Sequence, residues 1–273
     1  MCRWLAYSGP PVLMSTLLTR PDHSLIDQSR HARENIVTTN GDGFGVGWYG
    51  NAEKPGCYHE THPAWNDLNL KHLAAHISSR LFLAHVRAAT GTPVQQSNCH
   101  PFAFEDWLFQ HNGMVPEFSR IKRRLLFKVA PDLFPHIRGS TDSEALFFLA
   151  LTFGLKDDPQ AAIERTVGHV ECVRKEAGIQ QPFTFSAAMS DGTRLYGVRY
   201  SSDANSPSLY HGQHLHALQE LHDTYEPLPS GAVVVVSEPL DEVSNHWTRV
   251  PESTFLMIEN GKLTHLPLVP TAA

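Results

Sequence analysis

Short runs of β-forming residues, separated by glycine, dominate the first half of the chain. Four of them read CRWLAYSG, GFGVGWYG, LFLAHVRAAT and WLFQHNG, at residues 2–9, 43–50, 81–90 and 107–113. Each run carries apolar side chains on both of its alternating faces, which is typical of a sheet that is covered on both sides. The sequence therefore predicts a layered core built around β-sheets.

Strands return after residue 180. Asp191-Gly192 and Asn260-Gly261 each separate two β-type runs and predict two-residue hairpin turns. The predicted strands of this half are 183–190, 193–201, 231–239, 255–259 and 262–266.

Two convincing helices lie between these halves. Thr141 to Glu144 has the T-x-x-E form of a capping box, so a helix is expected to begin just after Thr141. Apolar residues spaced by three and four from Ile163 to Ala177 predict a second helix, with Gly178 as its stop. A further short helix is expected near residues 117–128. The fold class is α+β.

Length and charge narrow the class of protein. No linker interrupts the 273 residues, so one domain spanning residues 2–273 is expected. The net charge is -6 and the longest basic block is residues 122–124, which argues against nucleic acid as a partner. No stretch approaches 18 apolar residues and the start lacks the apolar core of a signal peptide, so we expect a cytoplasmic protein without a membrane partner.

Cys2 is the first candidate for chemistry. Methionine aminopeptidase removes Met1 when the next side chain is small, which would place a free α-amine on the residue that carries the thiol. Such an amine has a reference pKa of about 7.7 to 8.0 and can accept the thiol proton near neutral pH. From position alone, a cysteine that merely packs in the first strand is the more common outcome.

Arg87 lies near the end of the strand 81–90, followed by small residues and by Thr90-Gly91. Strand alternation places His85 and Arg87 on the same face. A guanidinium in such a tight space offers a planar fork to a carboxylate. Taken alone, the segment is also compatible with an arginine in a surface ion pair.

The strand 107–113 stops at Asn112-Gly113. A turn here can aim the side-chain amide of Asn112 and the backbone N–H of Gly113 at one point, as a developing oxyanion requires. An ordinary hairpin turn is the alternative, because Asn-Gly is the commonest sequence for such turns.

Asp142 lies in the first turn of the helix that begins after Thr141. The positive end of the helix dipole favours an ionised carboxylate there. This carboxylate can hold an ammonium group, or it can be an ordinary capping acid.

Taken together, these segments resemble the class II glutamine amidotransferases. The resemblance covers residues 2 to about 155 by motif, and within the family it is similar to the stand-alone bacterial γ-glutamyl amidohydrolases of the ergothioneine and glutathione-degradation type. The ordered motifs are Cys2, DGFGVGW at 42–48, HVRAAT at 85–90, NCHP at 98–101, HNG at 111–113 and TDSE at 141–144.

The resemblance implies a four-layer αββα sandwich of the N-terminal-nucleophile (Ntn) hydrolases, with two mostly antiparallel sheets covered by helices and the C-terminal strands completing it. It also implies that Cys2 attacks a γ-glutamyl amide, forms a glutamyl thioester, and releases ammonia or an amine and then glutamate, without a cofactor. The implied roles are general base for the Cys2 amine, oxyanion hole for Asn112 and Gly113, α-carboxylate binding for Arg87, α-ammonium binding for Asp142, and pocket lining for Thr90, Gly91 and His100.

Two departures from the family concern the pocket's closure. The aminosugar-synthesising members carry Trp after the arginine and His further along, where this chain has Ala88 and Gly91. The resemblance leaves the leaving group open among ammonia from glutamine, glutathione-like γ-glutamyl thiols and γ-glutamyl amines. Plain hydrolysis is the favoured reaction, and an ammonia-supplying subunit for a separate synthase is the alternative.

Three rival interpretations are kept. The cluster His211, His214, His216 and His222 invites a metal site, although its spacing does not match common zinc motifs. Cys99 with an internal histidine would make a papain-like hydrolase. A non-catalytic module that keeps the fold is the third, and retention of Met1 would favour it.

Overall fold

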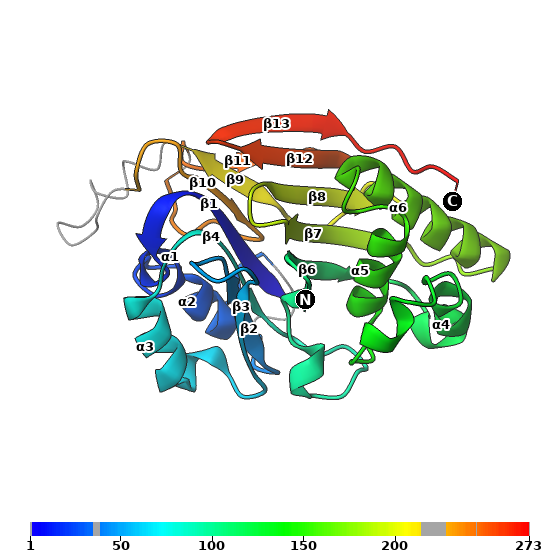
Figure 1. Ribbon diagram of the computed structural model, residues 1–273, viewed down its shortest axis with the longest axis horizontal. Coiled ribbons are helices and arrows are strands. Elements are labelled where there is room, and N and C mark those ends of the chain that lie inside the picture. The colour runs from blue at the N-terminus through cyan, green and yellow to red at the C-terminus, as the bar shows by residue number, and fades with distance from the viewer. Residues whose placement is uncertain (1, 35–38, 214–227, 244, 273) are drawn as a thin grey trace.

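Two antiparallel sheets are stacked face to face in the computed structural model, which describes residues 2–34, 39–213, 228–243 and 245–272 (Figure 1). The first sheet has the strand order β11-β9-β10-β1-β4-β2-β3 and the second has the order β13-β12-β8-β7-β6-β5. The first sheet is built from β1 (Arg3–Leu13), β2 (Phe44–Trp48), β3 (Gly56–Glu60), β4 (Ser78–Val86), β9 (Tyr210–Gln213), β10 (Val233–Val236) and β11 (Thr248–Arg249). The second is built from β5 (Phe102–Phe104), β6 (Trp107–Met114), β7 (Thr184–Ser190), β8 (Leu195–Ser201), β12 (Thr254–Glu259) and β13 (Lys262–Pro267).

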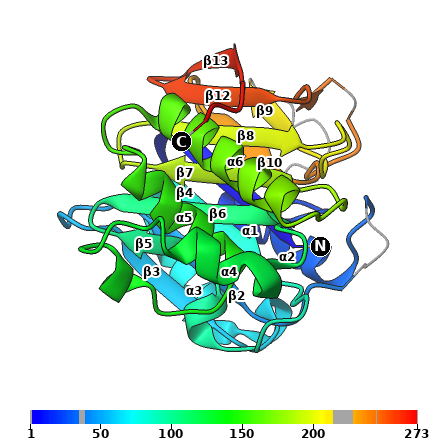
Figure 2. The same ribbon diagram turned by 90° about the vertical axis from the view of Figure 1, so that its right-hand side faces the viewer.

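Helices cover both outer faces of the sandwich. The first sheet is covered by α1 (Ser15–Leu18), α2 (Leu25–Arg30) and α3 (Leu68–His76). The second is covered by α4 (Phe118–Leu126), α5 (Asp142–Thr152) and α6 (Pro159–Glu176), which lie in front of it in Figure 2. Short 3-10 helices span Ala64–Asn66, Gln96–Asn98 and Phe134–His136. The expected four-layer αββα sandwich is confirmed.

Three apolar clusters fill the three spaces between the four layers. Trp4 and Ala6 of β1 join the cluster between the sheets, whereas Leu5 and Tyr7 join the cluster beneath α1 to α3. The third cluster lies between the second sheet and α4 to α6. Because successive side chains of a strand point to opposite faces, β1 must be apolar on both, which explains the patterning of its sequence.

The sequence predicted the main elements well. The strands expected in 2–9, 43–50, 81–90, 107–113, 183–190, 193–201, 231–239, 255–259 and 262–266 correspond to β1, β2, β4, β6, β7, β8, β10, β12 and β13. The helix expected near 117–128 is α4. The helix expected at 163–177 is α6, which begins earlier, after the cap Asp158, and is followed by Gly178 at φ 72°. Shorter elements, including α1 to α3, β3, β5, β9 and β11, were not predicted.

Two local predictions need correction. No turn forms at Asn112-Gly113, because both residues pair with β7 and β6 ends one residue later, with Met114 opposite Thr184. Thr141 does cap α5 by accepting a hydrogen bond from Glu144 N at 3.1 Å. The Glu144 carboxylate, however, accepts from the backbone N–H groups of Arg138 and Gly139 and so anchors the preceding loop.

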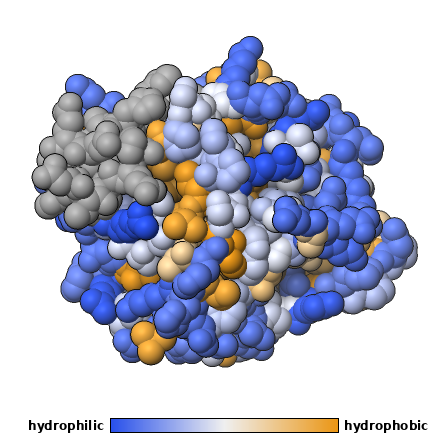
Figure 3. Space-filling model, turned by 60° about the vertical axis from the view of Figure 1, so that its left-hand side comes forward, coloured by the Kyte–Doolittle hydropathy of each residue, from blue (hydrophilic) through white to orange (hydrophobic). Residues whose placement is uncertain are grey.

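Polar side chains cover most of the face shown in Figure 3, where apolar ones gather in a smaller central band. Within the described ranges, no helix combines the length and the apolar character that crossing a bilayer requires.

Candidate active site

The sulfur of Cys2 lies against the end of β4. The backbone N–H of Ala88 donates to Cys2 Sγ at 3.4 Å, and the Sγ–H group can donate to the Ala88 carbonyl at 3.6 Å. Cys2 is partly exposed, yet burial of its sulfur raises the pKa of the thiol, despite opposing effects that include the charges of Arg87 and Arg3. The thiol is therefore neutral near pH 7 and needs a base before it can attack. Met1 lies outside the described residues, so its removal stays a prediction.

Three strands converge at this end of the sandwich. β1 pairs with β4, with Trp4 opposite His85 and Arg3 opposite Val86. β6 approaches both from the other sheet, since Gln110 Nε2 donates to the Leu5 carbonyl at 3.0 Å and His85 Nε2 lies 3.3 Å from the His111 carbonyl. The start of β1 accordingly lies beside β6 (Figure 1). Cys2, Arg87 and Asn112 are the next residues along, beyond Arg3 at the start of β1, Val86 at the end of β4 and His111 of β6.

Arg87 is a buried cation without a carboxylate partner in the described part of the chain. It is 3% exposed, and its guanidinium donates to the carbonyls of Asp42 and Pro93 at 3.3 Å and to the Thr92 hydroxyl at 2.7 Å. These neutral oxygens orient the group but leave its charge uncompensated. A buried arginine in this condition is suited to bind an anionic ligand.

The side-chain amide of Asn112 is a buried hydrogen-bond donor at this end of the sandwich. Its side chain is 2% exposed, and its Nδ2 group has no hydrogen-bond partner among the described residues. Leaving a buried donor unpaired costs free energy, of the order of 1–3 kcal/mol. Such a group therefore needs an explanation, and a catalytic role is one of them. Gly113 is required by packing, because a Cβ there would lie 2.1 Å from the Thr184 carbonyl oxygen.

Asp142 faces neutral donors. Its Oδ2 accepts from Val115 N at 2.8 Å and its Oδ1 accepts from Ser143 N at 2.9 Å. No cationic side chain of the described residues forms an ion pair with it. The carboxylate therefore caps its own helix and supports the end of β6, and its negative charge remains available to a cationic ligand.

Three buried histidines stand behind these groups. The rings of His85 and His100 lie 4.2 Å apart, and His100 also packs against Phe102 at 4.5 Å. Burial lowers the pKa of His85 to about 3, and also lowers the pKa values of His100 and His111. His111 Nδ1 lies 2.9 Å from the Ser143 hydroxyl and so connects β6 to α5. The expected wall residue His100 is thus an uncharged ring close to the strand of Arg87.

The predicted pocket residues Thr90 and Gly91 lie in an exposed loop. Gly91 has φ 75°, a conformation that favours glycine, and their contacts with substrate stay a prediction. Two polar residues near Arg87 were not predicted: Thr92, its hydroxyl partner, and Asp42, whose carboxylate accepts from Ala89 N at 2.8 Å. Asp42 opens the DGFGVGW motif, which was the available signal for it.

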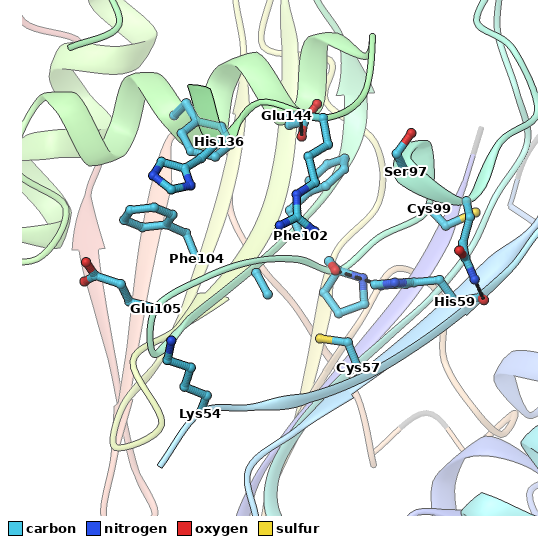
Figure 4. Close-up of a pocket in the computed structure, with 15 residues that line it drawn as sticks. Lys54, Cys57, His59, Ser97, Cys99, Phe102, Phe104, Glu105, His136 and Glu144 are labelled. Carbon is cyan, nitrogen blue, oxygen red and sulfur yellow. Dashed lines mark hydrogen bonds between the residues drawn. The ribbon is translucent and has the colours of Figure 1, made fainter. Parts of the chain in front are cut away.

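The rival thiol Cys99 lies in a different environment. It is 1% exposed, its Sγ faces the carbonyls of Glu60 and Gln95, and burial raises its pKa to about 11. It contributes to the wall of a cavity of about 540 Å³ between the edge strands β3 and β5 (Figure 4). The lining of that cavity includes neither Cys2 nor Arg87, so the cavity is not the site described above.

The histidine cluster falls mostly outside the described residues, since His214, His216 and His222 belong to the part that is not described. His211 is described, and its ring lies 5.1 Å from that of His265. No group of three or more potential metal ligands occurs within the described ranges.

Comparisons with known proteins identify the family of this chain. Residues 22–273 match the family described as "Glutamine amidotransferases class-II". The chain is 32% identical over 313 residues to the "Probable glutamine amidotransferase DUG3" of Saccharomyces cerevisiae, and the match covers 98% of this chain and 85% of that protein. It is 34% identical over 117 residues to the "Gamma-glutamyl-hercynylcysteine sulfoxide hydrolase" of Mycolicibacterium smegmatis, covering 42% of this chain and 52% of that protein.

Solved structures show the same fold. A "glutamine aminotransferase class-II domain protein" from Silicibacter pomeroyi is 34% identical, with a TM-score of 0.76 over 99% of this chain and 100% of that one. The glutamine phosphoribosylpyrophosphate amidotransferase of B. subtilis is 15% identical, with a TM-score of 0.64 over 99% of this chain and 50% of that one. At this identity the second comparison supports the fold alone.

Proposed function

Because this chain belongs to the class II glutamine amidotransferases, we propose that it hydrolyses γ-glutamyl compounds at the site formed by Cys2, Arg87, Asn112 and Asp142. Cys2 is the nucleophile. The unpartnered, buried Nδ2 group of Asn112 is the observation that carries this proposal, because it supplies a donor suited to a developing oxyanion at the end of the sheet where Cys2 lies.

The thiol of Cys2 must be deprotonated as it attacks, because burial raises its pKa. After removal of Met1, the α-amine of Cys2 is attached to the same Cα atom and can accept this proton. Its reference pKa of about 7.7 to 8.0 leaves part of it unprotonated near neutral pH. The nucleophile and its base are therefore supplied by one residue.

Arg87 and Asp142 bind the amino-acid end of the substrate in this proposal. The uncompensated guanidinium of Arg87 pairs with the α-carboxylate, and the carboxylate of Asp142 pairs with the α-ammonium group. Thr90, Gly91 and His100 line the same pocket. Together these groups select a γ-linked glutamyl unit and leave the group beyond the γ-carbonyl unrestricted.

The reaction proceeds in two balanced halves. Cys2 Sγ bonds to the γ-carbonyl carbon while its proton passes to the amine, and Asn112 Nδ2 and Gly113 N stabilise the oxyanion. The C–N bond then breaks as the ammonium group returns the proton to the departing nitrogen, which leaves a γ-glutamyl thioester. Water attacks this thioester along the same path, with the amine accepting its proton and the sulfur leaving as the thiol, so that glutamate is released.

Hydrolysis is preferred over ammonia supply on the basis of the similar proteins. One relative is named as a hydrolase of a γ-glutamyl sulfoxide, although it matches only part of the chain. An ammonia-accepting synthase subunit is the alternative partner. Release of glutamate from glutamine, glutathione and a γ-glutamyl amine should be compared with the purified protein. The second measurement adds a synthase that consumes ammonia. If the rate of glutamate release does not change, hydrolysis is favoured; if the rate rises, ammonia supply is favoured.

Two cysteine variants test the nucleophile. Cys2→Ala should abolish glutamate release, and Cys99→Ala should retain it because Cys99 lies in the wall of another cavity. A diazoketone analogue of glutamine should label Cys2 in the wild type, as read by peptide mass spectrometry. Labelling of Cys99, or activity in Cys2→Ala, would contradict the proposal.

A further inference from the structure

A fully buried guanidinium lies directly behind the proposed nucleophile. Arg3 is 1% exposed, and its Nη1 group donates to the Cys2 carbonyl at 3.0 Å, while its Nε group donates to Glu238 Oε2 at 2.8 Å. We propose that Arg3, held by Glu238, is a positioning residue that fixes the Cys2 carbonyl and so, together with the contact of Cys2 Sγ with Ala88, sets the direction of the Cys2 amine. This inference rests on the proposed function.

Glu238 holds Arg3 firmly because it is itself held from several sides. Its carboxylate is buried, accepts from Arg33 N at 2.7 Å and Glu34 N at 3.3 Å, and lies 2.5 Å from His23 Nε2. Burial alone would raise the pKa of Glu238, but the hydrogen bonds from His23 and Arg33 N and the charge of Arg3 lower it to about 2. Glu238 therefore stays ionised, and Arg3 keeps both its counter-charge and its orientation.

Cys2 needs such support because it lies just outside the strand ladder. The paired register of β1 with β4 begins at Arg3, opposite Val86. With the carbonyl fixed, the amine can still turn about the Cα–C bond of Cys2, which is a soft torsion, so a second contact on the residue is needed. The contact of Sγ with Ala88 holds the other end of the residue. Together the two contacts set the relative positions of thiol and base.

Arg3 also acts on Cys2 through its charge. Although burial raises the pKa of the Cys2 thiol, the cations Arg87, from the end of β4, and Arg3, from β1, both lower it. A nearby cation likewise disfavours the ammonium form of the amine. Two described carboxylates are hydrogen-bonded to neighbours of Cys2: Glu238 offsets Arg3, and Asp42 accepts from Ala89 N. His23 faces Glu238 and Asp27. The Cys99 thiol is a further titratable group, close enough to Cys2 and Arg87 for their charges to affect its pKa.

The structure also contains a matched control. Arg174 is another buried arginine that pairs with a glutamate, Glu171, at 2.7 Å and donates to the Ile179 carbonyl at 3.0 Å. It lies on α6, on the opposite side of the second sheet from β1. Loss of its side chain should cost stability in the same way but should leave Cys2 unaffected.

The decisive experiment compares Arg3→Met, Arg3→Lys and Arg174→Met, each checked by mass spectrometry for loss of Met1. Arg3→Met should lower kcat about 100-fold, the scale of a misplaced reacting group, with little change in KM. The acid limb of its kcat/KM profile should move to higher pH because the amine holds its proton more strongly. Arg3→Lys should recover part of kcat, and Arg174→Met should keep the wild-type limb.

Glu238→Gln gives an independent test if Arg3→Met does not fold. It keeps an acceptor for Arg3 but removes the compensating charge, so the acid limb should move to lower pH, opposite to Arg3→Met. Wild-type kcat and an unmoved limb in the folded variants would overturn the inference. Labelling of wild-type Cys2 by the glutamine diazoketone then separates the two proposals. If Cys2 is labelled, the proposed function stands and only the role of Arg3 is wrong. If another residue is labelled, the proposed function itself is wrong.

Discussion

Asp142 Oδ2 accepts a hydrogen bond from the backbone N–H of Val115 at 2.8 Å, which ties the start of α5 to the residue that follows β6. The strand supported in this way carries Asn112 and Gly113. The second link between the same elements is the contact of His111 Nδ1 with the Ser143 hydroxyl at 2.9 Å. The group proposed to bind the substrate ammonium is thus also part of the frame of the proposed oxyanion hole.

Replacing Asp142 by Asn should separate these two roles. Asparagine keeps an oxygen for Val115 N but removes the charge that would bind the substrate ammonium. A hydrogen bond to a charged group contributes about 1.5–3 kcal/mol, so kcat/KM for glutamine should fall roughly ten- to hundredfold. A γ-amide without the α-amino group should lose much less, as measured by initial rates. Equal losses for both substrates would show that Asp142 does not bind the ammonium group.

Asn112→Ala should lower kcat by a factor of about 100 to 1000, the usual cost of losing one oxyanion donor. The variant should fold normally, because the wild-type Nδ2 group makes no hydrogen bond with the described residues. Stopped assays of glutamate release at saturating substrate, with Tm as the control for folding, provide the measurement. Near-normal kcat would remove Asn112 from the mechanism.

Local motifs explain how much of the site could be predicted from sequence. Cys2, Arg87 and Asp142 could be proposed because each lies in a short motif of the family that the sequence resembles, and their roles stay predictions. The partner of Arg3 could not be found in this way, since Glu238 is 235 residues away and the contact depends on how β10 pairs with β1. Thr92 was missed because its contact with Arg87 depends on the path of a loop.

The fold was predicted in outline for a similar reason. Alternation and turn sequences are local, so the long strands and the two main helices were identified. A turn was expected at Asn112-Gly113, because Asn-Gly usually marks one, and the pairing of these residues with Ser186 and Phe185 of β7 is not visible in the sequence. Tertiary pairing overrode the local preference of these two residues.

The folded protein should lose stability as pH falls below about 6.5, in part because of His85. Burial lowers the pKa of His85 from 6.5 to about 3, so between these values the unfolded chain binds a proton that the folded chain does not. This contribution is complete above pH 6.5 and is lost as the pH falls toward about 3. His85→Gln should therefore show a shallower decline of Tm between pH 7 and pH 4.

The control for this slope is His72→Gln, because His72 lies on the exposed surface of α3. Its Tm should follow the wild-type curve. If His85→Gln and the wild type decline in parallel, the buried imidazole does not contribute to the acid sensitivity.

Gly113→Ala should damage both stability and catalysis. A Cβ at this position would lie 2.1 Å from the Thr184 carbonyl oxygen and 2.4 Å from His111 Nε2, and the first of these belongs to the paired backbone of β7. Overpacking of this kind typically costs about 1–3 kcal/mol, and relief requires β6 to move away from β7, which displaces Asn112. Tm and kcat should both fall. In the matched variant Gly50→Ala, the added Cβ has no atom within 4 Å, so Tm and kcat should stay close to those of the wild type. If Tm falls in Gly113→Ala but kcat does not, displacement of Asn112 does not impair catalysis, and the oxyanion is stabilised by other groups.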